Sequence, residues 1–435
     1  MSPLSSLSPR GLRRAIALAL GLLLASPWTL AQSDPPPARV ARLGHAEGRV
    51  LGVWPGESNW STLDPLAPLL PGTPLYVEPG ARGEVQYGAN TLRLDGATQA
   101  RVEALDDHRA QFQLTDGALS LRIRALHSGE RHEIDTPNLA FVANAPGEYR
   151  FDVDAARGLT RVTLRSGSGT AWGEQGEAMP LTAPAQVVFS GRRLTIARWE
   201  SAGPRDAFDT WVAARDLAEE RSVSARHVSR EVVGYQQLDA WGDWRVDAEY
   251  GSIWLPRVTV SDWAPYRYGR WRWIDPWGWT WIDDAPWGFA PFHYGRWRQV
   301  RNRWAWVPGP SQARPAYAPA LVGFIGLSGT SGNTQWNLAL GSGGPAVGWF
   351  PLAPGETWRP TWRASPEHLS RYNPAWPRRD AQAPEYRYRQ SPEALSAAPR
   401  DRFGNTRHGA EAALPRGAAR VIPRLELAPP PPAPV

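Results

Sequence analysis

Tryptophan and arginine side chains are the residues of this sequence whose spacing first suggests a chemical role. Thirteen of the 24 tryptophans lie between Trp241 and Trp306, and several are followed directly by an arginine. Indole rings stack on sugars and anchor protein partners, and guanidinium groups stack on indole faces. The candidate binding face comprises Trp271, Trp273, Trp279, Trp281, Trp297, Trp304, Trp306, Arg270 and Arg296. The alternative, that most of these rings form the core of a β-fold, stays open.

Other residue patterns give little support for catalysis. Asp283 and Asp284 could suggest the paired acids of a glycosidase, but the hairpin register predicted below puts them on opposite faces, with Asp284 opposite Arg270. His127 and His132 lack an acid at metal-site spacing, and we interpret them as surface loop residues. There is no cysteine and no GxSxG or HExxH motif. We therefore predict a protein that is not an enzyme and uses no cofactor and no metal.

A repeat organises the Trp-rich stretch. Residues 264–272 (APYRYGRWR) recur 26 positions later as residues 290–298 (APFHYGRWR), and a weaker copy precedes them at residues 244–254. A period in this range marks the stacking of one supersecondary unit. The turn residues between the aromatic runs indicate that this unit is a β-hairpin, so we predict a hairpin-repeat domain over residues 234–358.

Turn chemistry predicts the register of the central hairpin. Asp275-Pro276-Trp277-Gly278 is typical of a type I turn, and a left-handed Gly278 would close a three-residue loop. This register pairs residue 271 with residue 283. It places four rings on one face, namely Trp271, Trp273, Trp279 and Trp281.

The neighbouring copies give the same aromatic alignment. A two-residue loop at Asn302-Arg303 would pair residue 299 with residue 306. The rings that then share a face are Trp297, Trp304 and Trp306. In the first copy, a loop at residues 249–251 aligns Trp244 with Trp254. A looser fourth pairing is predicted between residues 322–324 and residues 347–352.

Residues 40–200 show a different pattern of short alternating segments broken by Gly, Asp and Pro. In ALSLRIR, the apolar Leu119, Leu121 and Ile123 alternate with polar residues, which is the period of a half-buried strand. Turn signals recur about every ten residues, which predicts an all-β domain built as a sandwich, roll or solenoid. A helix predicted over residues 204–232 would link this domain to the hairpin-repeat domain.

The segments PGTPLYVEPGARGEVQYGANTLRLDG, FQLTDGALSLRI and APGEYRFDVD contain Gly72, Gly80, Gly117 and Gly147 at the turns between strands. With these marks, residues 40–175 resemble a FecR-like periplasmic domain. FecR regulators relay an outer-membrane signal to a cytoplasmic sigma factor. The resemblance implies that the domain is an envelope-signalling module, and it implies nothing of the rest of the regulatory circuit.

Segments such as GYQQLDAWGDW, YGSIWLP, WAPYRYGRW and VGWFPL carry a second resemblance. They are similar to a Trp-rich domain of unknown function found behind FecR-like domains in bacterial envelope proteins. This resemblance implies a location in the cell envelope and implies no activity.

Both ends of the chain indicate export and surface contact. Residues 1–31 have a charged start, a short apolar run and small residues before Gln32, which is typical of a secretory signal peptide, with a membrane anchor as the alternative. Sec and twin-arginine export both stay open. Residues 32–39 are a linker, and no later segment is apolar enough to cross a membrane. Residues 359–435 are rich in Pro and Arg, which predicts a disordered basic tail that contacts anionic envelope surfaces.

Charge and export together limit the function. Of the formal net charge of +6, the positive excess lies in residues 1–31 and from Glu356 onward, so nucleic acid is not an expected partner. We predict an exported, periplasmic, non-enzymatic envelope protein that acts as a protein-interaction, scaffold or signalling module. The alternative is a glycan- or peptidoglycan-binding module that uses an exposed Trp face. The expected partner is accordingly an envelope protein or a glycan polymer.

Overall fold

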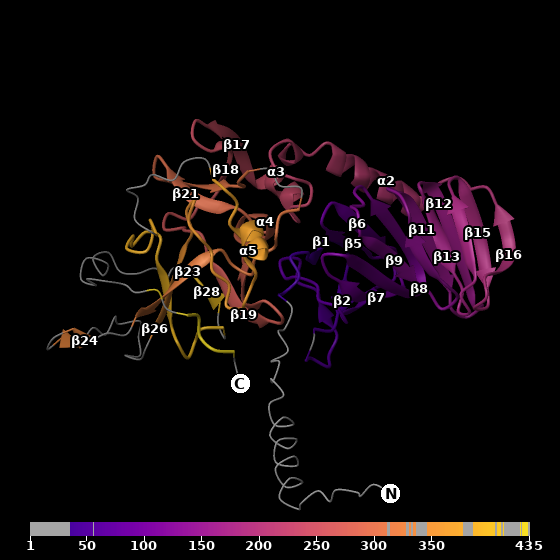
Figure 1. Cartoon of the computed structure of the whole chain (residues 1–435), viewed down its shortest axis with the longest axis horizontal. Helices are drawn as coiled ribbons and strands as arrows, with labels where there is room; N and C mark the ends of the chain where they lie inside the picture. Colours follow the sequence, from indigo (N-terminus) through magenta and orange to yellow (C-terminus); the bar gives the residue numbers. More distant parts are fainter. Residues whose placement is uncertain are drawn as a thin grey trace, which may run out of the picture. The chain divides into compact units, whose positions relative to one another are not determined.

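β-Strands form most of the secondary structure in the computed structural model (Figure 1), which confirms the predicted all-β class. The structure describes residues 35–54, 56–310, 314–327, 330–331, 334–335, 346–376, 386–404, 407–409, 412, 427 and 429–433. The predicted signal peptide, residues 1–31, lies outside the described residues.

The strands between Ala41 and Glu200, which we call the N-terminal β-domain, form two sheets that share the long strand β8. Its strands are β1 (Ala41–Glu47), β2 (Val50–Gly52), β3 (Ser61–Thr62), β4 (Pro74–Val77), β5 (Arg82–Tyr87), β6 (Asn90–Leu94), β7 (Thr98–Leu105), β8 (Arg109–Ile123), β9 (Arg131–Asp135), β10 (Ala140–Ala143), β11 (Gly147–Asp154), β12 (Leu159–Ser166), β13 (Ser168–Trp172), β14 (Ala178–Thr182), β15 (Ala185–Ser190) and β16 (Thr195–Glu200). The first half of β8 pairs with β7 and β9, and its second half pairs with β6 and β11.

Gly117 lies where β8 passes from one sheet to the other. Its φ is +93°, and a Cβ built there would lie 2.5 Å from Oγ1 of Thr98. A residue with a side chain would be strained by the backbone conformation and would also clash with β7. The glycine that sequence analysis placed at a turn therefore permits one strand to serve both sheets.

Aromatic side chains fill the space between the two sheets. Phe141 of β10 contacts Phe151 and Tyr149 of β11, with ring centroids 5.2 Å and 5.6 Å apart. Tyr87 of β5 and Phe112 of β8 meet at 5.2 Å. All five rings are buried. Of the three predicted architectures, this arrangement of two facing sheets is a sandwich.

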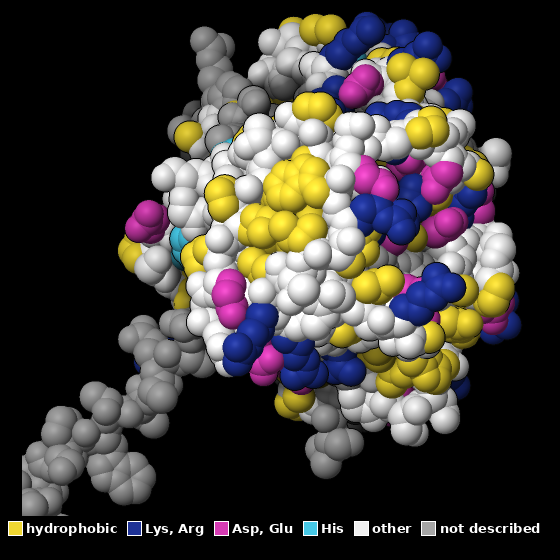
Figure 2. Space-filling view, turned by 90° about the vertical axis from the view of Figure 1, so that its right-hand side faces the viewer, with side chains coloured by type: hydrophobic (Ala, Val, Ile, Leu, Met, Phe, Trp, Pro, Cys, Tyr) yellow, Lys and Arg dark blue, Asp and Glu magenta, His cyan; other side chains and the backbone are white. Residues whose placement is uncertain are grey.

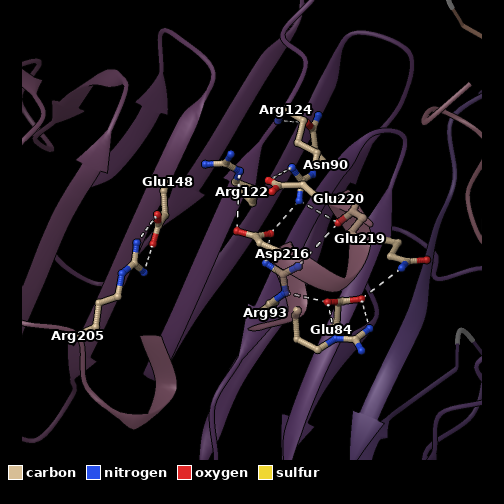
Figure 3. A network of polar contacts seen from close by, with 12 residues as sticks. Glu84, Asn90, Arg93, Arg122, Arg124, Glu148, Arg205, Asp216, Glu219 and Glu220 are labelled. Atoms are coloured by element: carbon tan, nitrogen blue, oxygen red, sulfur yellow. Dashed lines mark hydrogen bonds and ion pairs between the residues drawn. The ribbon is translucent and has the colours of Figure 1, made fainter. Parts of the chain in front are cut away.

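Helix α2 (Ala207–Glu220) contacts the N-terminal β-domain largely through charged side chains (Figure 3). Arg93 of β6 is fully buried and donates to Glu84 at 2.8 Å and to Asp216 of α2 at 2.9 Å. Arg124 lies 3.0 Å from Asp216 and 3.2 Å from Glu219. Because an unpaired charge is costly when it is buried between a helix and a sheet, these ion pairs specify where α2 lies on the sheet.

The helix is shorter than the predicted 204–232. Its start is set by Asp206, whose carboxylate accepts the backbone N–H of Asp209 at 2.8 Å. After Glu220 the chain forms the 3-10 turn η1 (Ser224–Arg226), where Asp239 accepts the N–H of Ser224 at 2.8 Å. A side chain that captures a main-chain donor in this way competes with continuation of the helix.

The Trp-rich domain, which is the predicted hairpin-repeat domain, forms five hairpin-like pairings in four separate sheets among its described residues. Its elements are η2 (Tyr235–Gln237), α3 (Leu238–Trp241), β17 (Gly242–Asp247), β18 (Gly251–Pro256), β19 (Gly269–Ile274), β20 (Gly278–Asp283), α4 (Phe289–His293), β21 (Arg296–Val300), β22 (Arg303–Val307), β23 (Val322–Leu327), β24 (Thr330–Ser331), β25 (Thr334–Gln335) and β26 (Ala346–Pro351). The first and third hairpins join through Trp254 and Trp306, whereas the second is in another sheet. The repeat therefore does not build the single stack that its period predicts.

The register of the central hairpin differs from the prediction, but its aromatic face is confirmed. Trp271 lies opposite Trp281, and Trp273 lies opposite Trp279, so residue 271 does not pair with residue 283. The loop spans residues 275–277. Gly278 has the predicted left-handed conformation, with φ of +80°. Because both registers keep the same parity, the four rings still share one side of the hairpin.

The other hairpins keep the predicted aromatic faces, but two of their loops are shifted. The pairing of β23 with β26 is as predicted. Trp244 lies opposite Trp254, and the loop of this first hairpin spans residues 248–250 rather than the predicted 249–251. In the third hairpin the loop is Arg301-Asn302, one residue earlier than predicted, and both residues have positive φ. Two left-handed residues in succession are typical of the type I′ turn, whose twist suits a tight hairpin.

The C-terminal segment predicted to be disordered is folded where the structure describes it. It contains α5 (Pro366–Tyr372), β27 (Ser396–Pro399) and β28 (Arg407–His408), and β27 and β28 add to sheets of the Trp-rich domain. Tyr386 and Phe403 are buried there. The prediction of disorder over 359–435 is therefore wrong for these residues.

Two buried arginines tie this segment to the Trp-rich domain. Arg296 of β21 donates to the carbonyl oxygens of Glu356 and Tyr372, the latter at 3.0 Å. Arg267 donates to the carbonyl oxygen of Leu395 at 2.9 Å. A guanidinium has five N–H donors in a rigid plane, so one side chain satisfies carbonyls from separate segments.

The N-terminal β-domain and the Trp-rich domain also contact each other within the unit Pro37–Val435. Arg272 donates to Glu57 at 2.8 Å and lies over the ring of Trp54, 4.8 Å from its centroid. Arg371 of α5 donates to Asp107 at 2.5 Å. Charged and cation–π contacts of this kind fix orientation more than they add stability.

Candidate functional site

The predicted binding face is mostly core. At most 1 % of the side chain is exposed in Trp271, Trp281, Trp297 and Trp306, and 8–9 % in Trp304 and Trp279. Trp271 packs against Trp281 and Trp349 with centroids 5.3 Å and 5.8 Å apart, in edge-to-face contacts that stabilise a core. Of the predicted rings, Trp273 alone is half-buried.

The two predicted arginines also point elsewhere. Arg270 forms an ion pair with Asp64 of the N-terminal β-domain, and its expected partner Asp284 lies 3.6 Å from Arg407 instead. Arg296 is buried among backbone carbonyls. These side chains join segments of the fold, so neither forms the rim of an aromatic face.

Trp273 and Trp279 nevertheless line a cavity of about 600 Å³, which we call the aromatic groove. Its walls include Trp273, Trp277, Trp279, Phe324, Trp358 and Trp362. The first three come from the β19–β20 hairpin, Phe324 from β23, and the last two from the chain after β26. The C-terminal prolines 429–432 lie along the same groove.

Ring–ring contacts hold the walls in place. Trp273 and Trp279 pack nearly perpendicular, at 88° with centroids 5.6 Å apart. Trp358 and Trp362 make a similar contact at 68° and 5.6 Å. Aromatic pairs in this geometry contribute about 0.5–1.5 kcal/mol beyond their buried area. The groove is therefore built from pairs of rings that support each other.

Three indole N–H groups of the hairpin have defined acceptors. Trp273 Nε1 donates to Asp275 Oδ1 at 2.9 Å, and Trp277 Nε1 donates to the Pro37 carbonyl at 3.0 Å. Trp279 Nε1 donates to the carbonyl oxygen of Pro431 at 2.8 Å. The first two bonds orient the rings within the fold, whereas the third reaches a residue that lies in the groove.

The lining of the groove is largely apolar and carries no carboxylate. Its polar side chains are Thr357, Arg359, Thr361 and Tyr386, along with the indole N–H groups. General acid–base catalysis needs titratable groups at the reacting atoms. The described lining thus offers apolar contact and hydrogen bonds to a ligand rather than a pair of catalytic acids.

Buried titratable groups elsewhere have structural partners. Burial raises the pKa of Asp283 to about 8, and its two oxygens accept from Trp281 Nε1 and from the N–H of Ala285, both at 2.9 Å. Burial lowers the pKa of His293 to about 4, and its Nδ1 lies 2.8 Å from the carbonyl of Ala318. Neither group lines the aromatic groove.

His127 and His132 are held by acids rather than by a metal-site geometry. His127 Nε2 is 3.2 Å from Glu231, and His132 Nε2 is 3.4 Å from Glu130. His132 is buried on β9, so its interpretation as a surface residue is wrong. Among the described residues there is no cluster of three or more His, Asp or Glu side chains that could bind a metal.

None of the described helices has the length and apolar character needed to span a membrane.

Exposed tryptophans occur in the N-terminal β-domain, where the sequence did not suggest a site. Trp60, Trp172 and Trp199 are 51 %, 41 % and 55 % exposed. Figure 2 shows the side that carries β15 and β16, on which small hydrophobic patches lie among interspersed Arg and acidic side chains. Scattered apolar groups of this size are ordinary on a protein surface.

Sequence reasoning missed three of the groove's five indole rings. Trp277 was assigned to a turn, and Trp358 and Trp362 lie at the junction between the Trp-rich domain and the predicted tail. A signal was available, since Trp358-Arg359 and Trp362-Arg363 repeat the Trp-Arg pair of Trp271-Arg272.

Comparison with known proteins identifies one segment. Residues 235–356 match the family described as "Family of unknown function (DUF6600)". The match contains the β19–β20 hairpin and Phe324, and it ends just before Trp358. No curated protein matches the chain.

Among solved structures, two crystal structures of a candidate anti-sigma factor from Parabacteroides distasonis ATCC 8503 show low similarity. One is 14 % identical over 29 % of this chain and 59 % of that chain, with a TM-score of 0.26. The other is 13 % identical over 32 % of this chain and 64 % of that chain, with a TM-score of 0.28. The chain thus spans less than two thirds of these relatives, and similarity at this level defines neither a fold nor a function.

Proposed function

We propose that this chain is an exported, non-enzymatic interaction module of the cell envelope, and that the aromatic groove is its binding site for a protein segment. The observation that carries the proposal is the groove itself. Five indole rings line a cavity of about 600 Å³ in a domain whose remaining predicted rings are buried. Cavities of this size that are lined by aromatic side chains are typical of binding sites.

The lining favours a protein segment over a glycan. A sugar chain carries many hydroxyl groups, and each one that is buried without a partner costs about 1–3 kcal/mol. The polar side chains of the groove are limited to two threonines, one arginine and Tyr386, and its described lining has no Asp, Glu, Asn or Gln. An apolar peptide segment with a few carbonyl acceptors matches this lining better. Glycan binding through the same rings is the alternative.

The remaining parts of the proposal rest on sequence. The pattern of residues 1–31 supports export, and the FecR-like pattern of residues 40–175 supports a role in envelope signalling or scaffolding. The many contacts between the N-terminal β-domain and the Trp-rich domain suit a scaffold that presents the groove in a fixed orientation.

Photo-crosslinking in the native host tests the proposal. Benzoylphenylalanine replaces Thr361, an exposed residue on the groove wall. The matched control carries the same group at Val246 of β17, which is 87 % exposed and does not line the groove. We expect one protein adduct at position 361 that is absent at position 246. Adducts to glycan alone at position 361, or identical adducts at both positions, would refute the proposal.

A further inference from the structure

We infer that the aromatic groove is a recognition site for proline-rich segments, and that residues 429–432 of this chain are its intramolecular ligand. The inference rests on the proposed function of the groove and specifies the chemistry of its partner. Four consecutive prolines, Pro429 to Pro432, line the groove together with its tryptophans, and Pro431 is buried there.

The hydrogen bond that Trp279 makes in the groove suits a proline carbonyl. Trp279 is 9 % exposed, and its Nε1 donates to the Pro431 carbonyl oxygen at 2.8 Å. Proline has no N–H, and a polyproline segment forms no internal hydrogen bonds, so its carbonyls are free to accept. A buried indole N–H beside apolar ring faces therefore matches both halves of a proline residue, the ring and the carbonyl.

A second contact fixes how the segment enters the groove. Leu427 forms an isolated antiparallel bridge with Ile325 of β23 and also lines the groove. The backbone of residue 427 is thus held at β23, and Pro431 is held at Trp279 of β20. Two separate anchors define a direction for the segment, which nonspecific apolar contact would not do.

Proline is favoured in such a groove for a physical reason. Its fixed φ pre-organises an extended segment, so binding loses little backbone entropy. Aromatic-lined grooves that bind proline-rich segments in this way are a recurring mode of peptide recognition. The Trp273–Trp279 and Trp358–Trp362 pairs, whose rings meet at 88° and 68°, line the same groove as the four prolines.

A consequence is competition between the chain's own prolines and a partner's. A ligand on the same chain has a high effective concentration, so a proline-rich segment of another protein binds only after it displaces residues 429–432. The groove is then a switchable docking site, in which a partner of the same chemistry replaces residues 429–432 at Trp279.

Peptide binding to the purified full chain tests this inference. The probe is a fluorescent peptide with the sequence of residues 427–433 (LAPPPPA), followed by anisotropy, and the control peptide has serine in place of each proline. In one variant, Pro429, Pro430, Pro431 and Pro432 are each replaced by serine, which unseats the intramolecular ligand. We expect this variant to bind the proline peptide about tenfold or more tighter than the wild type does. Neither protein should bind the serine peptide.

A second substitution checks the site. Trp279→Phe in the four-serine background keeps an aromatic ring but removes the indole donor, and it should weaken peptide binding about five- to tenfold. Trp60→Phe, at an exposed ring outside the groove, should leave binding unchanged. The inference fails if the folded four-serine variant binds the proline peptide no tighter than the wild type, or binds the serine peptide equally.

The two tests separate the two claims. A protein adduct at position 361 without proline-peptide binding would keep the proposed function and overturn its proline specificity. Proline-peptide binding without a protein adduct would support the recognition chemistry and overturn a partner in trans.

Discussion

The ion network beneath α2 gives the sharpest stability prediction, which is the effect of Arg93→Met. Arg93 is completely buried, and it bonds to Glu84 and to Asp216 of α2 (Figure 3). Removing one partner of a buried pair costs about 3–5 kcal/mol, because the other charge stays buried. Glu84 keeps Arg215 at 3.1 Å, and Asp216 keeps Arg124 at 3.0 Å. We therefore expect a loss near the lower limit, about 3 kcal/mol at pH 7.

The pKa of Glu84 leads to a similar magnitude for the contribution of this ion network to the free energy of unfolding. Burial raises the pKa of Glu84, but the charges and hydrogen bonds of Arg93 and Arg215 have the larger opposite effect. The pKa therefore falls from 4.5 to about 2. A carboxyl whose pKa is depressed by folding adds stability above its unfolded pKa and loses it as the pH falls toward the folded value. This shift corresponds to about 3 kcal/mol between pH 5 and pH 2. Without Arg93 the pKa of Glu84 rises, so the variant should lose less stability in acid than the wild type.

Urea denaturation followed by far-UV circular dichroism at pH 7 and pH 3 measures both effects. The matched control is Arg157→Met, because Arg157 pairs with Asp154 at 3.6 Å with 78 % of its side chain exposed. Such a surface pair should contribute about 1 kcal/mol or less. The reasoning would be wrong if both substitutions cost the same at pH 7, or if the gap between wild type and Arg93→Met did not narrow at pH 3.

Three further outcomes can be checked by thermal or urea denaturation. Trp271→Ala should destabilise by about 3–5 kcal/mol because the ring is fully buried, whereas Trp60→Ala should cost about 1 kcal/mol or less; equal costs would contradict the core assignment of Trp271. Gly117→Ala should destabilise by about 1–3 kcal/mol through its positive φ and the contact with β7, and a neutral effect would show that β8 passes between the sheets differently. Burial raises the pKa of Asp283 in the folded protein to about 8, so its ionisation lowers the free energy of unfolding as the pH rises from about 4 to about 8. Asp283→Asn should remove this pH dependence of stability. An unchanged profile of stability against pH would refute the raised pKa.

Patterns of strand and turn were readable from the sequence because they depend on near neighbours. The alternation of Leu119, Leu121 and Ile123 predicted β8 correctly, and the left-handed Gly278 was anticipated from turn chemistry. Hairpin loops were displaced by one residue, since the choice between turn types depends on twist and packing beyond the loop. The shared faces survived because the displaced register of the central hairpin keeps the same alternation.

The order of the C-terminal segment and the burial of each tryptophan depend on tertiary contacts, so they could not be predicted from the sequence. Composition suggested disorder after residue 358, yet Tyr386 and Phe403 are spaced so that each fills a gap in the Trp-rich domain. Whether a tryptophan is core or exposed depends on which segment covers it. Trp271 is covered by Phe403, from a segment that composition alone assigned to solvent, with ring centroids 5.4 Å apart. The groove was missed for the same reason, since its walls come from both sides of the predicted domain boundary.

The guanidinium ties of Arg267 and Arg296 bear on how this protein can be produced. The chain has no cysteine, so hydrogen bonds to arginine, sheet pairing and ring packing join its distant segments in place of disulfides. Burial lowers the pKa of Arg296 to about 10, which still leaves the group cationic at neutral pH. These ties form equally under reducing and oxidising conditions. The same native contacts should therefore form in a reducing cytosol without a disulfide isomerase, and reductants in a purification buffer should leave the fold intact.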